Sequence, residues 1–98
     1  MEVGIVGLGR MGLNMARRAS LGGHRAVGFD SRPEAMEAAR KDGIEAASTL
    51  DELVSKLSHP RVVWIMLPEG RPVDGTITVL RPLLAEGDMI VDGGNSFY

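Results

Sequence analysis

The chain has 98 residues, a formal net charge of −2 and no cysteine. A chain of this length forms one small domain, and without cysteine it has neither a disulfide framework nor a thiolate metal site. Acidic and basic residues are interspersed and no apolar run reaches the ~18 residues of a membrane span, so we expect neither nucleic acid nor a membrane as a partner. No signal-peptide pattern opens the sequence, and we expect a cytoplasmic location.

The first third of the chain predicts a strand, a helix and a second strand. Glu2–Val6 and Arg25–Phe29 are short, apolar and rich in β-branched residues, which is typical of buried strands. Between them, Arg10–Leu21 contains no proline and is followed by two glycines, so it is a predicted helix. The apolar stripe expected for this helix consists of Met11, Met15 and Leu21.

Two capping boxes predict the starts of the next two helices. Ser31 would be the N-cap of a helix over Pro33–Asp42, with Glu34 three residues later. Thr49 and Glu52 repeat the same pattern before a shorter helix.

The last third of the chain predicts two more strands and a helix between them. Val62–Leu67 is the most apolar run and is a predicted central strand. Within Pro72–Leu84, the alternating segment Thr76–Leu80 favours a strand by local propensity. Parallel strands need a crossover connection, however, so we predict a helix there, perturbed near Pro82. Met89–Val91 is the final predicted strand.

These elements follow one another in the order βαβαβαβ. Because crossovers between parallel strands are right-handed, this order predicts an α/β fold with a parallel sheet and helices on both faces. We expect a Rossmann-like sheet with strand order 3-2-1-4, in which Met89–Val91 is an outer strand beside the first. An outer strand without a charge, proline or bulge is a template for pairing with another chain, so we also expect a homo-oligomer.

A glycine motif follows the first predicted strand and opens the first helix. Gly7, Gly9 and Gly12 have the spacing G-x-G-x-x-G, and Asp30 lies 18 residues after Gly12, at the end of the second strand. Such a loop permits a tight turn, close approach of the backbone to a pyrophosphate and close packing of helix on strand. The helix N-terminus then holds the phosphates and the acid holds the ribose hydroxyls. The alternative is a glycine-rich turn that binds nothing.

Two segments together resemble a known enzyme family. "GLGRMGLNMARR" begins at Gly7, and "DGGNSFY" ends the chain. The pair resembles the decarboxylating 6-phosphogluconate dehydrogenases, a branch of the β-hydroxyacid dehydrogenases. The resemblance implies oxidation and decarboxylation of 6-phosphogluconate to ribulose 5-phosphate with NAD or NADP. It also implies that residues 1–98 are the N-terminal part of a dinucleotide-binding domain, while the catalytic lysine, the glutamate and the helical domain lie outside this chain.

The resemblance assigns cofactor contacts residue by residue. The expected cofactor-binding residues are Gly7, Leu8, Gly9, Arg10, Met11, Gly12, Asp30, Ser31, Arg32, Leu67, Pro68, Glu69 and Asn95. Asn95 would also touch the substrate, and no catalytic or metal-binding residue is expected in this chain. Many members have "NRT" where this sequence has "DSR". We therefore expect a preference for NAD over NADP, although Arg32 can swing toward a 2′-phosphate.

Two other readings stay open at this point. Another β-hydroxyacid dehydrogenase, of the 3-hydroxyisobutyrate type, would share the first motif, but it usually has a Ser/Thr-rich sequence in place of "DGGNS". The other alternative is a nucleotide-binding module without catalysis, such as a nucleotide-sensing domain.

Overall fold

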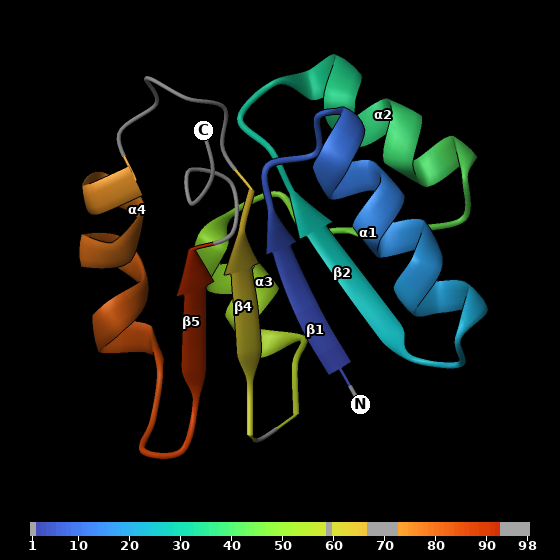
Figure 1. Ribbon diagram of the computed structural model, residues 1–98. Helices are drawn as coiled ribbons and strands as arrows, with labels where there is room; N and C mark the ends of the chain where they lie inside the picture. The colour runs from blue at the N-terminus through green and yellow to red at the C-terminus, as the bar shows by residue number, and fades with distance from the viewer. Residues whose placement is uncertain (1, 59, 67–72, 93–98) are drawn as a thin grey trace.

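The computed structural model of the chain describes residues 2–58, 60–66 and 73–92. They form a parallel five-stranded sheet in the order β3-β2-β1-β4-β5. The elements in chain order are β1 Glu2–Val6, α1 Arg10–Leu21, β2 Arg25–Phe29, α2 Pro33–Lys41, β3 Glu45–Ala46, α3 Leu50–Ser55, β4 Val62–Ile65, α4 Val73–Leu80, the 3₁₀ turn Arg81–Leu83 and β5 Met89–Asp92. Because all strands point the same way, their carboxyl ends share one edge of the sheet, at the top of Figure 1.

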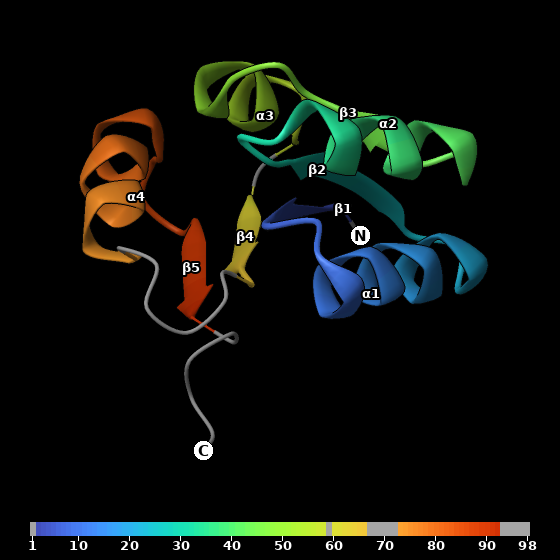
Figure 2. The ribbon, with the colours of Figure 1, turned by 90° about the horizontal axis from the view of Figure 1, so that it is seen from above.

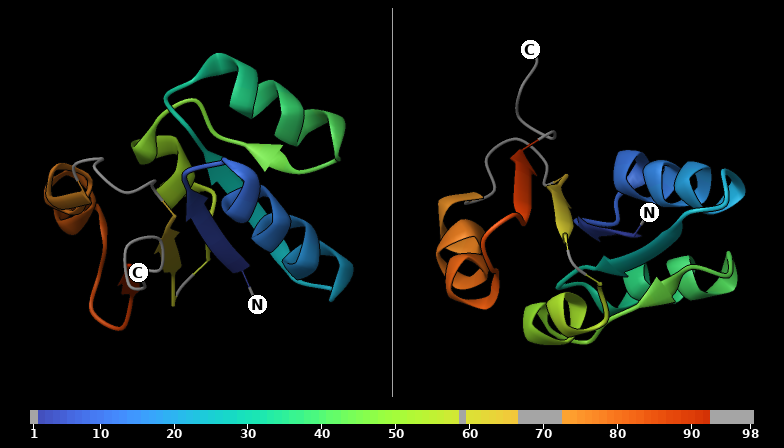
Figure 3. Two further views of the ribbon diagram at one scale, coloured as in Figure 1. Left: turned by 45° about the horizontal axis from the view of Figure 1, so that its top comes forward. Right: turned by 90° about the horizontal axis from the view of Figure 1, so that it is seen from below.

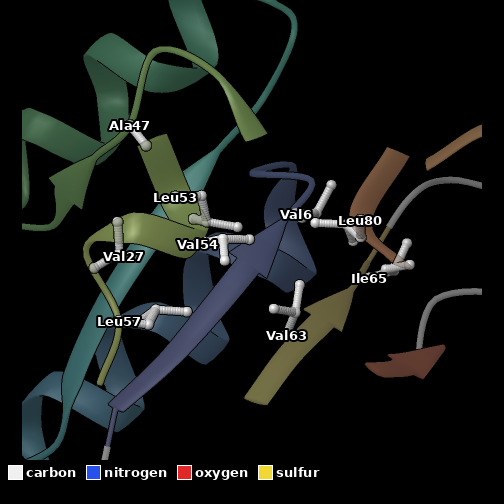
Figure 4. Close-up of a cluster of buried hydrophobic side chains, with 9 residues drawn as sticks. All are labelled: Val6, Val27, Ala47, Leu53, Val54, Leu57, Val63, Ile65 and Leu80. Atoms are coloured by element: carbon white, nitrogen blue, oxygen red, sulfur yellow. The ribbon is translucent and has the colours of Figure 1, made fainter. Parts of the chain in front are cut away.

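The helices cover the sheet from both sides, as Figures 2 and 3 show. Successive residues of a strand point to opposite faces, so Ile5 belongs to the core beneath α1 and α2, while Val6 belongs to the core beneath α3 and α4. The second of these cores is drawn in Figure 4 and consists of Val6, Val27, Ala47, Leu53, Val54, Leu57, Val63, Ile65 and Leu80. The two cores fix the sheet between two layers of helices, which is the predicted Rossmann-like architecture.

The segment between β4 and β5 is a helix, as the need for a crossover between parallel strands predicted and contrary to its local strand propensity. Val73–Leu80 is helical, although Thr76–Leu80 alternates like a strand. The helix gives way to a 3₁₀ turn over Arg81–Leu83, which contains Pro82. Proline cannot donate the hydrogen bond that continues an α-helix, and this accounts for the predicted perturbation at that residue.

One strand was not predicted, and it changes which segments are neighbours. β3 has only two residues, Glu45 and Ala46, which pair with Val27 and Gly28 of β2. Two residues are too few to show any periodicity. With β3 counted as the third strand, the order 3-2-1-4 holds. The predicted neighbours of two strands were wrong, however. The strand Val62–Ile65 pairs with β1 rather than with β2, and β5 pairs with β4 rather than with β1, at the outside of the described sheet.

The apolar stripe predicted for α1 was also wrong in two of its three members. Met11 is 51% exposed and Leu21 is 88% exposed. The helix buries Gly12 and Ala16 instead, while Met15 packs at the margin of the core. The small residues Gly12 and Ala16 thus form the buried face of the helix, while Met11 and Leu21 lie near its two ends and are exposed to solvent.

The start of α2 differs from the predicted capping box as well. Its N-cap is Arg32 rather than Ser31, and no side chain caps it. The Asp30 carboxylate accepts the Arg32 backbone N–H at 2.9 Å, which sets the turn before the helix. At α3 the prediction is confirmed, because the Thr49 hydroxyl oxygen accepts the Glu52 N–H at 3.0 Å. Within the described ranges, no helix is long and apolar enough to cross a membrane.

Candidate cofactor site

The loop between β1 and α1 lies at the carboxyl edge of the sheet, next to the end of β2 (Figure 1). Gly7 has a φ of 101°, in the region that favours glycine. Its N–H donates to the Phe29 carbonyl oxygen at 2.8 Å, so the loop is tied to β2 as it leaves β1. The turn therefore brings the glycine motif and the end of the second strand together, as the sequence predicted.

The other two glycines of the motif meet different surroundings. A Cβ at Gly12 would lie 1.8 Å from the Gly7 carbonyl oxygen, so no side chain fits between the helix and the loop. A Cβ at Gly9 would meet only the Arg32 Nη2, at an ordinary 3.8 Å. Gly12 therefore permits packing, whereas the bare backbone at Gly9 has only the Arg32 guanidinium within contact distance of a Cβ and is not covered by the rest of the fold.

The first turn of α1 offers backbone donors at the same place. Gly9 is the N-cap, and the Leu13 N–H donates to the Gly9 carbonyl oxygen at 2.8 Å, which starts the helical ladder. The N–H groups before Leu13 in α1 have no carbonyl one turn earlier in the helix. The first turn contains no acidic residue. The positive end of the helix dipole is thus available for an anion.

Asp30 lies across from this loop, at the end of β2, and is 6% exposed. Its Oδ2 accepts the Leu8 backbone N–H at 2.8 Å, which ties the glycine loop to the acid. The Arg32 guanidinium donates to both carboxylate oxygens at 3.1 Å. Burial would raise the pKa of Asp30, but the hydrogen bonds from Arg32 and Leu8 outweigh it and hold the pKa below its ordinary value. Asp30 is therefore charged, and its acceptors face the loop.

Leu8 and Gly28 form a contact that the sequence reading missed. The Leu8 side chain is 3% exposed, and a Cβ at Gly28 would lie 2.7 Å from the Leu8 Cδ2. The glycine in β2 thus provides the space into which Leu8 packs, and this packing fixes the Leu8 N–H opposite Asp30. A glycine inside a predicted strand, two residues before the acid, was the available signal for such a close approach.

The structure brings nine of the predicted cofactor-binding residues to this edge: Gly7, Leu8, Gly9, Arg10, Met11, Gly12, Asp30, Ser31 and Arg32. Arg10 and Met11 are exposed on the first turn of α1, and Ser31 is exposed beside Arg32. The other predicted residues lie outside the described residues: Leu67, Pro68, Glu69 and Asn95. In the described part of the chain, no three His, Cys, Asp or Glu side chains gather as a metal site would require.

A glycine loop, an open helix N-terminus and a buried acid at the end of β2 fit the adenosine diphosphate half of a dinucleotide. A sequence model of the family described as the NAD binding domain of 6-phosphogluconate dehydrogenase matches residues 2–98. The chain belongs to this family. The predicted resemblance to 6-phosphogluconate dehydrogenases is thereby confirmed.

Individual relatives agree with this assignment. The chain is 42% identical over 98 residues to the NAD⁺-dependent, decarboxylating 6-phosphogluconate dehydrogenase of Haloferax volcanii, covering all of this chain and 33% of that protein. It is 44% identical over 101 residues to the decarboxylating 6-phosphogluconate dehydrogenase of Synechocystis, covering 97% of this chain and 21% of that protein. The chain thus spans a third or less of these curated relatives.

Solved structures show the same fold. The Plasmodium falciparum 6-phosphogluconate dehydrogenase, solved with NADP⁺ and with 6-phosphogluconate, has a TM-score of 0.82 at 29% identity, over all of this chain and 22% of that one. The 3-hydroxyisobutyrate dehydrogenase of Mycobacterium tuberculosis has a TM-score of 0.80 at 28% identity, over 91% of this chain and 30% of that one. Other hydroxyacid dehydrogenases thus share the architecture, while the matching family is that of the 6-phosphogluconate enzymes.

Proposed function

We propose that the carboxyl edge of the sheet binds the adenosine diphosphate half of a nicotinamide dinucleotide. The observation that carries this proposal is the hydrogen bond from the Leu8 N–H to the Asp30 carboxylate, because it holds the acid beside the glycine loop. The N–H groups at the start of α1 would hold the pyrophosphate, and Gly9 would let it approach. Asp30 would accept hydrogen bonds from the ribose hydroxyls.

We further propose that this binding serves a 6-phosphogluconate dehydrogenase reaction in a longer protein. The bound cofactor would accept a hydride from 6-phosphogluconate, and loss of CO₂ would give ribulose 5-phosphate. The support is the family and the names of its curated relatives. Asn95 would touch both nicotinamide and substrate, and the loop containing Leu67, Pro68 and Glu69 would lie near the cofactor. A homo-oligomer and a cytoplasmic location stay predictions.

The 98-residue chain by itself is expected to be inactive. Oxidation of the substrate hydroxyl needs a group that removes its proton, and the described site offers no such base, because its acid, Asp30, is held at the adenosine end. Incubation of the purified chain with 6-phosphogluconate and either dinucleotide, followed by absorbance of the reduced cofactor, tests this. Turnover that copurifies with the chain through successive columns would contradict it.

We also propose that NAD is preferred over NADP. A 2′-phosphate ~4 Å from the Asp30 carboxylate would be repelled by between about 1 kcal/mol in water and about 4 kcal/mol at an effective dielectric constant of 20. Arg32 offsets part of this cost, because its guanidinium suits a phosphate. Calorimetric titration of the chain with NAD and with NADP should give a lower Kd for NAD. Tighter binding of NADP would refute the preference while leaving dinucleotide binding itself intact.

A further inference from the structure

The Asp30 carboxylate is already saturated with hydrogen-bond donors from the protein. Its Oδ1 accepts the Arg32 backbone N–H at 2.9 Å and the Arg32 Nε at 3.1 Å. Its Oδ2 accepts the Leu8 backbone N–H at 2.8 Å and the Arg32 Nη2 at 3.1 Å. A carboxylate offers about four lone-pair positions. Each of them is therefore used, and a ribose hydroxyl that needs an acceptor at Asp30 finds none open.

The four donors differ in how easily they can leave. Two are backbone N–H groups, one in the glycine loop and one at the N-cap of α2, and the fold fixes both. The other two belong to the Arg32 guanidinium, on a flexible side chain that is 42% exposed. An exposed guanidinium can exchange its partner for water at little cost. The guanidinium is thus the group that must move to make room.

The position of the guanidinium leads to the same conclusion. A Cβ on Gly9 would lie 3.8 Å from the Arg32 Nη2, so the guanidinium lies beside the bare backbone of the glycine loop. This is the side of the loop from which a dinucleotide would approach. A ligand there meets Arg32 in its path as well as on its acceptor.

We propose that the Arg32 guanidinium is an internal competitor of the adenosine ribose for Asp30, so that NAD binds only by displacing it. The inference rests on the proposed function, because it needs a dinucleotide at this edge. It makes Arg32 a specificity-determining residue with two opposite effects. Toward a free 2′-hydroxyl the guanidinium competes. Toward a 2′-phosphate it is a partner that also neutralises Asp30.

Removal of the guanidinium tests the proposal directly. Arg32→Ala should lower the Kd for NAD by about two- to fivefold, which is the range that an exposed ion pair gives. The same variant should raise the Kd for NADP. An NAD analogue with a 2′,3′-dideoxyadenosine moiety should gain nothing, since it does not need the Asp30 acceptors.

Arg17→Ala is the matched protein control. Arg17 is 47% exposed and also forms an ion pair, with Asp42, but this pair is not part of the cofactor site. Its removal should leave the Kd for NAD unchanged. A gain in both variants would mean that the effect is one of general charge, and would overturn the proposal.

Spectroscopy of the wild-type chain gives a second measurement that needs no stable variant. In ¹⁵N spectra of arginine side chains, the Arg32 Nε–H signal should move as NAD is added, and the Arg17 signal should not. An Arg32 signal that stays in place at saturation would overturn the proposal, as would an NAD Kd that is unchanged or higher in Arg32→Ala. If the wild-type chain binds neither dinucleotide, the proposed function fails first and the inference falls with it.

Discussion

The three glycines of the motif perform separate physical tasks at the level of single residues. Gly7 supplies a positive φ, and Gly12 leaves a space that no Cβ can enter. Gly9 does neither, because its φ of −72° and its open surroundings would both accept an alanine. Under the proposed function, the absence of a side chain at Gly9 would let a pyrophosphate approach the loop from outside. The roles of these glycines in folding and in binding can then be tested separately.

Alanine substitutions at Gly12 and Gly9 should separate these tasks. Gly12→Ala should lower the free energy of unfolding by about 1–3 kcal/mol or more, because the new Cβ collides with backbone. Gly9→Ala should fold normally but bind NAD roughly tenfold more weakly, a loss of about 1.4 kcal/mol. Urea unfolding and calorimetric titration of both variants measure this. Normal NAD binding by Gly9→Ala would show that no phosphate approaches the loop.

The lowered pKa of Asp30 predicts that the stability of the fold depends on pH. Burial alone would raise the pKa of the Asp30 carboxyl. The hydrogen bonds from Arg32 and Leu8 have the larger effect, so the pKa in the folded chain is lower than the ordinary value. The ionised carboxylate therefore stabilises the fold above its ordinary pKa of about 4, and this contribution is lost as pH falls through the lowered folded value. Asp30→Asn should be less stable than wild type at neutral pH. As the pH falls, the variant should lose less further stability than the wild type does.

Urea unfolding of wild type and Asp30→Asn at about pH 7, 4 and 3 measures that slope, since the two curves should converge as the carboxyl becomes protonated. Glu86→Gln, at an exposed carboxylate in the turn before β5 and outside any helix, is the control for the loss of one negative charge. If the curves of Asp30→Asn and wild type run parallel, the Asp30 carboxylate contributes no net charge-dependent stability.

At the scale of elements, two helices with the same sequence signal begin in different ways. Thr49 caps α3 through its hydroxyl, as a capping box requires. Ser31 does not cap α2, because the neighbouring Asp30 takes the Arg32 N–H and moves the N-cap to Arg32. The local signal was the same, and a competing acceptor two residues before Arg32, the Asp30 carboxylate, decided which residue became the N-cap.

The two hydroxyls should therefore differ in their contribution to stability. Thr49→Ala removes the hydrogen bond to the Glu52 N–H and should cost about 1 kcal/mol of unfolding free energy. Ser31→Ala should change stability by less than ~0.5 kcal/mol, because it removes no cap. Chemical denaturation of both variants in one buffer decides the matter. Equal losses would mean that Ser31 does cap α2 in solution.

Some of the helices and strands could be predicted from the sequence, and others could not. β1, α1 and β2 have the predicted bounds, because each is a regular pattern that ends at a glycine or a change of polarity. α4 was predicted from topology against its own propensity. β3 was out of reach, since two residues become a strand only through pairing with β2. Without it, the strand that begins at Val62 was placed beside β2 and the last strand beside β1, and both neighbours were wrong.

In the candidate site, too, some features could be predicted from sequence patterns and others could not. The spacing of Gly7, Gly9 and Gly12, with Asp30 at the end of β2, predicted where the candidate site lies, and the structure places these four residues at one edge of the sheet. The ion pair between Asp30 and Arg32 depends on a side-chain conformation, and the contact between Leu8 and Gly28 depends on the distance between loop and strand. Neither quantity has a sequence pattern, so both required the structure.

At the scale of the whole molecule, the strand order leaves β5 at the outside of the described sheet (Figure 1). β5 pairs with β4 along one side, and no described strand pairs with its other side. Met89 is 56% exposed, and the segment from Met89 to Val91 has neither charge nor proline to prevent edge pairing. An edge of this kind is a template for another strand.

We therefore predict that the 98-residue chain forms a weak two-fold dimer through β5, because antiparallel pairing of two identical edges closes the assembly. Light scattering after size-exclusion chromatography, over a series of concentrations, should show the average mass rising from monomer toward dimer.

Met89→Lys should shift the chain back to monomer, since a lysine on an edge strand opposes pairing. Leu21→Lys introduces the same charge at an exposed apolar residue at the end of α1, and should leave the dimer intact. If the wild-type chain stays monomeric at every concentration, the edge of β5 is covered in solution; if both lysine variants dissociate the dimer equally, general charge rather than edge pairing controls the association.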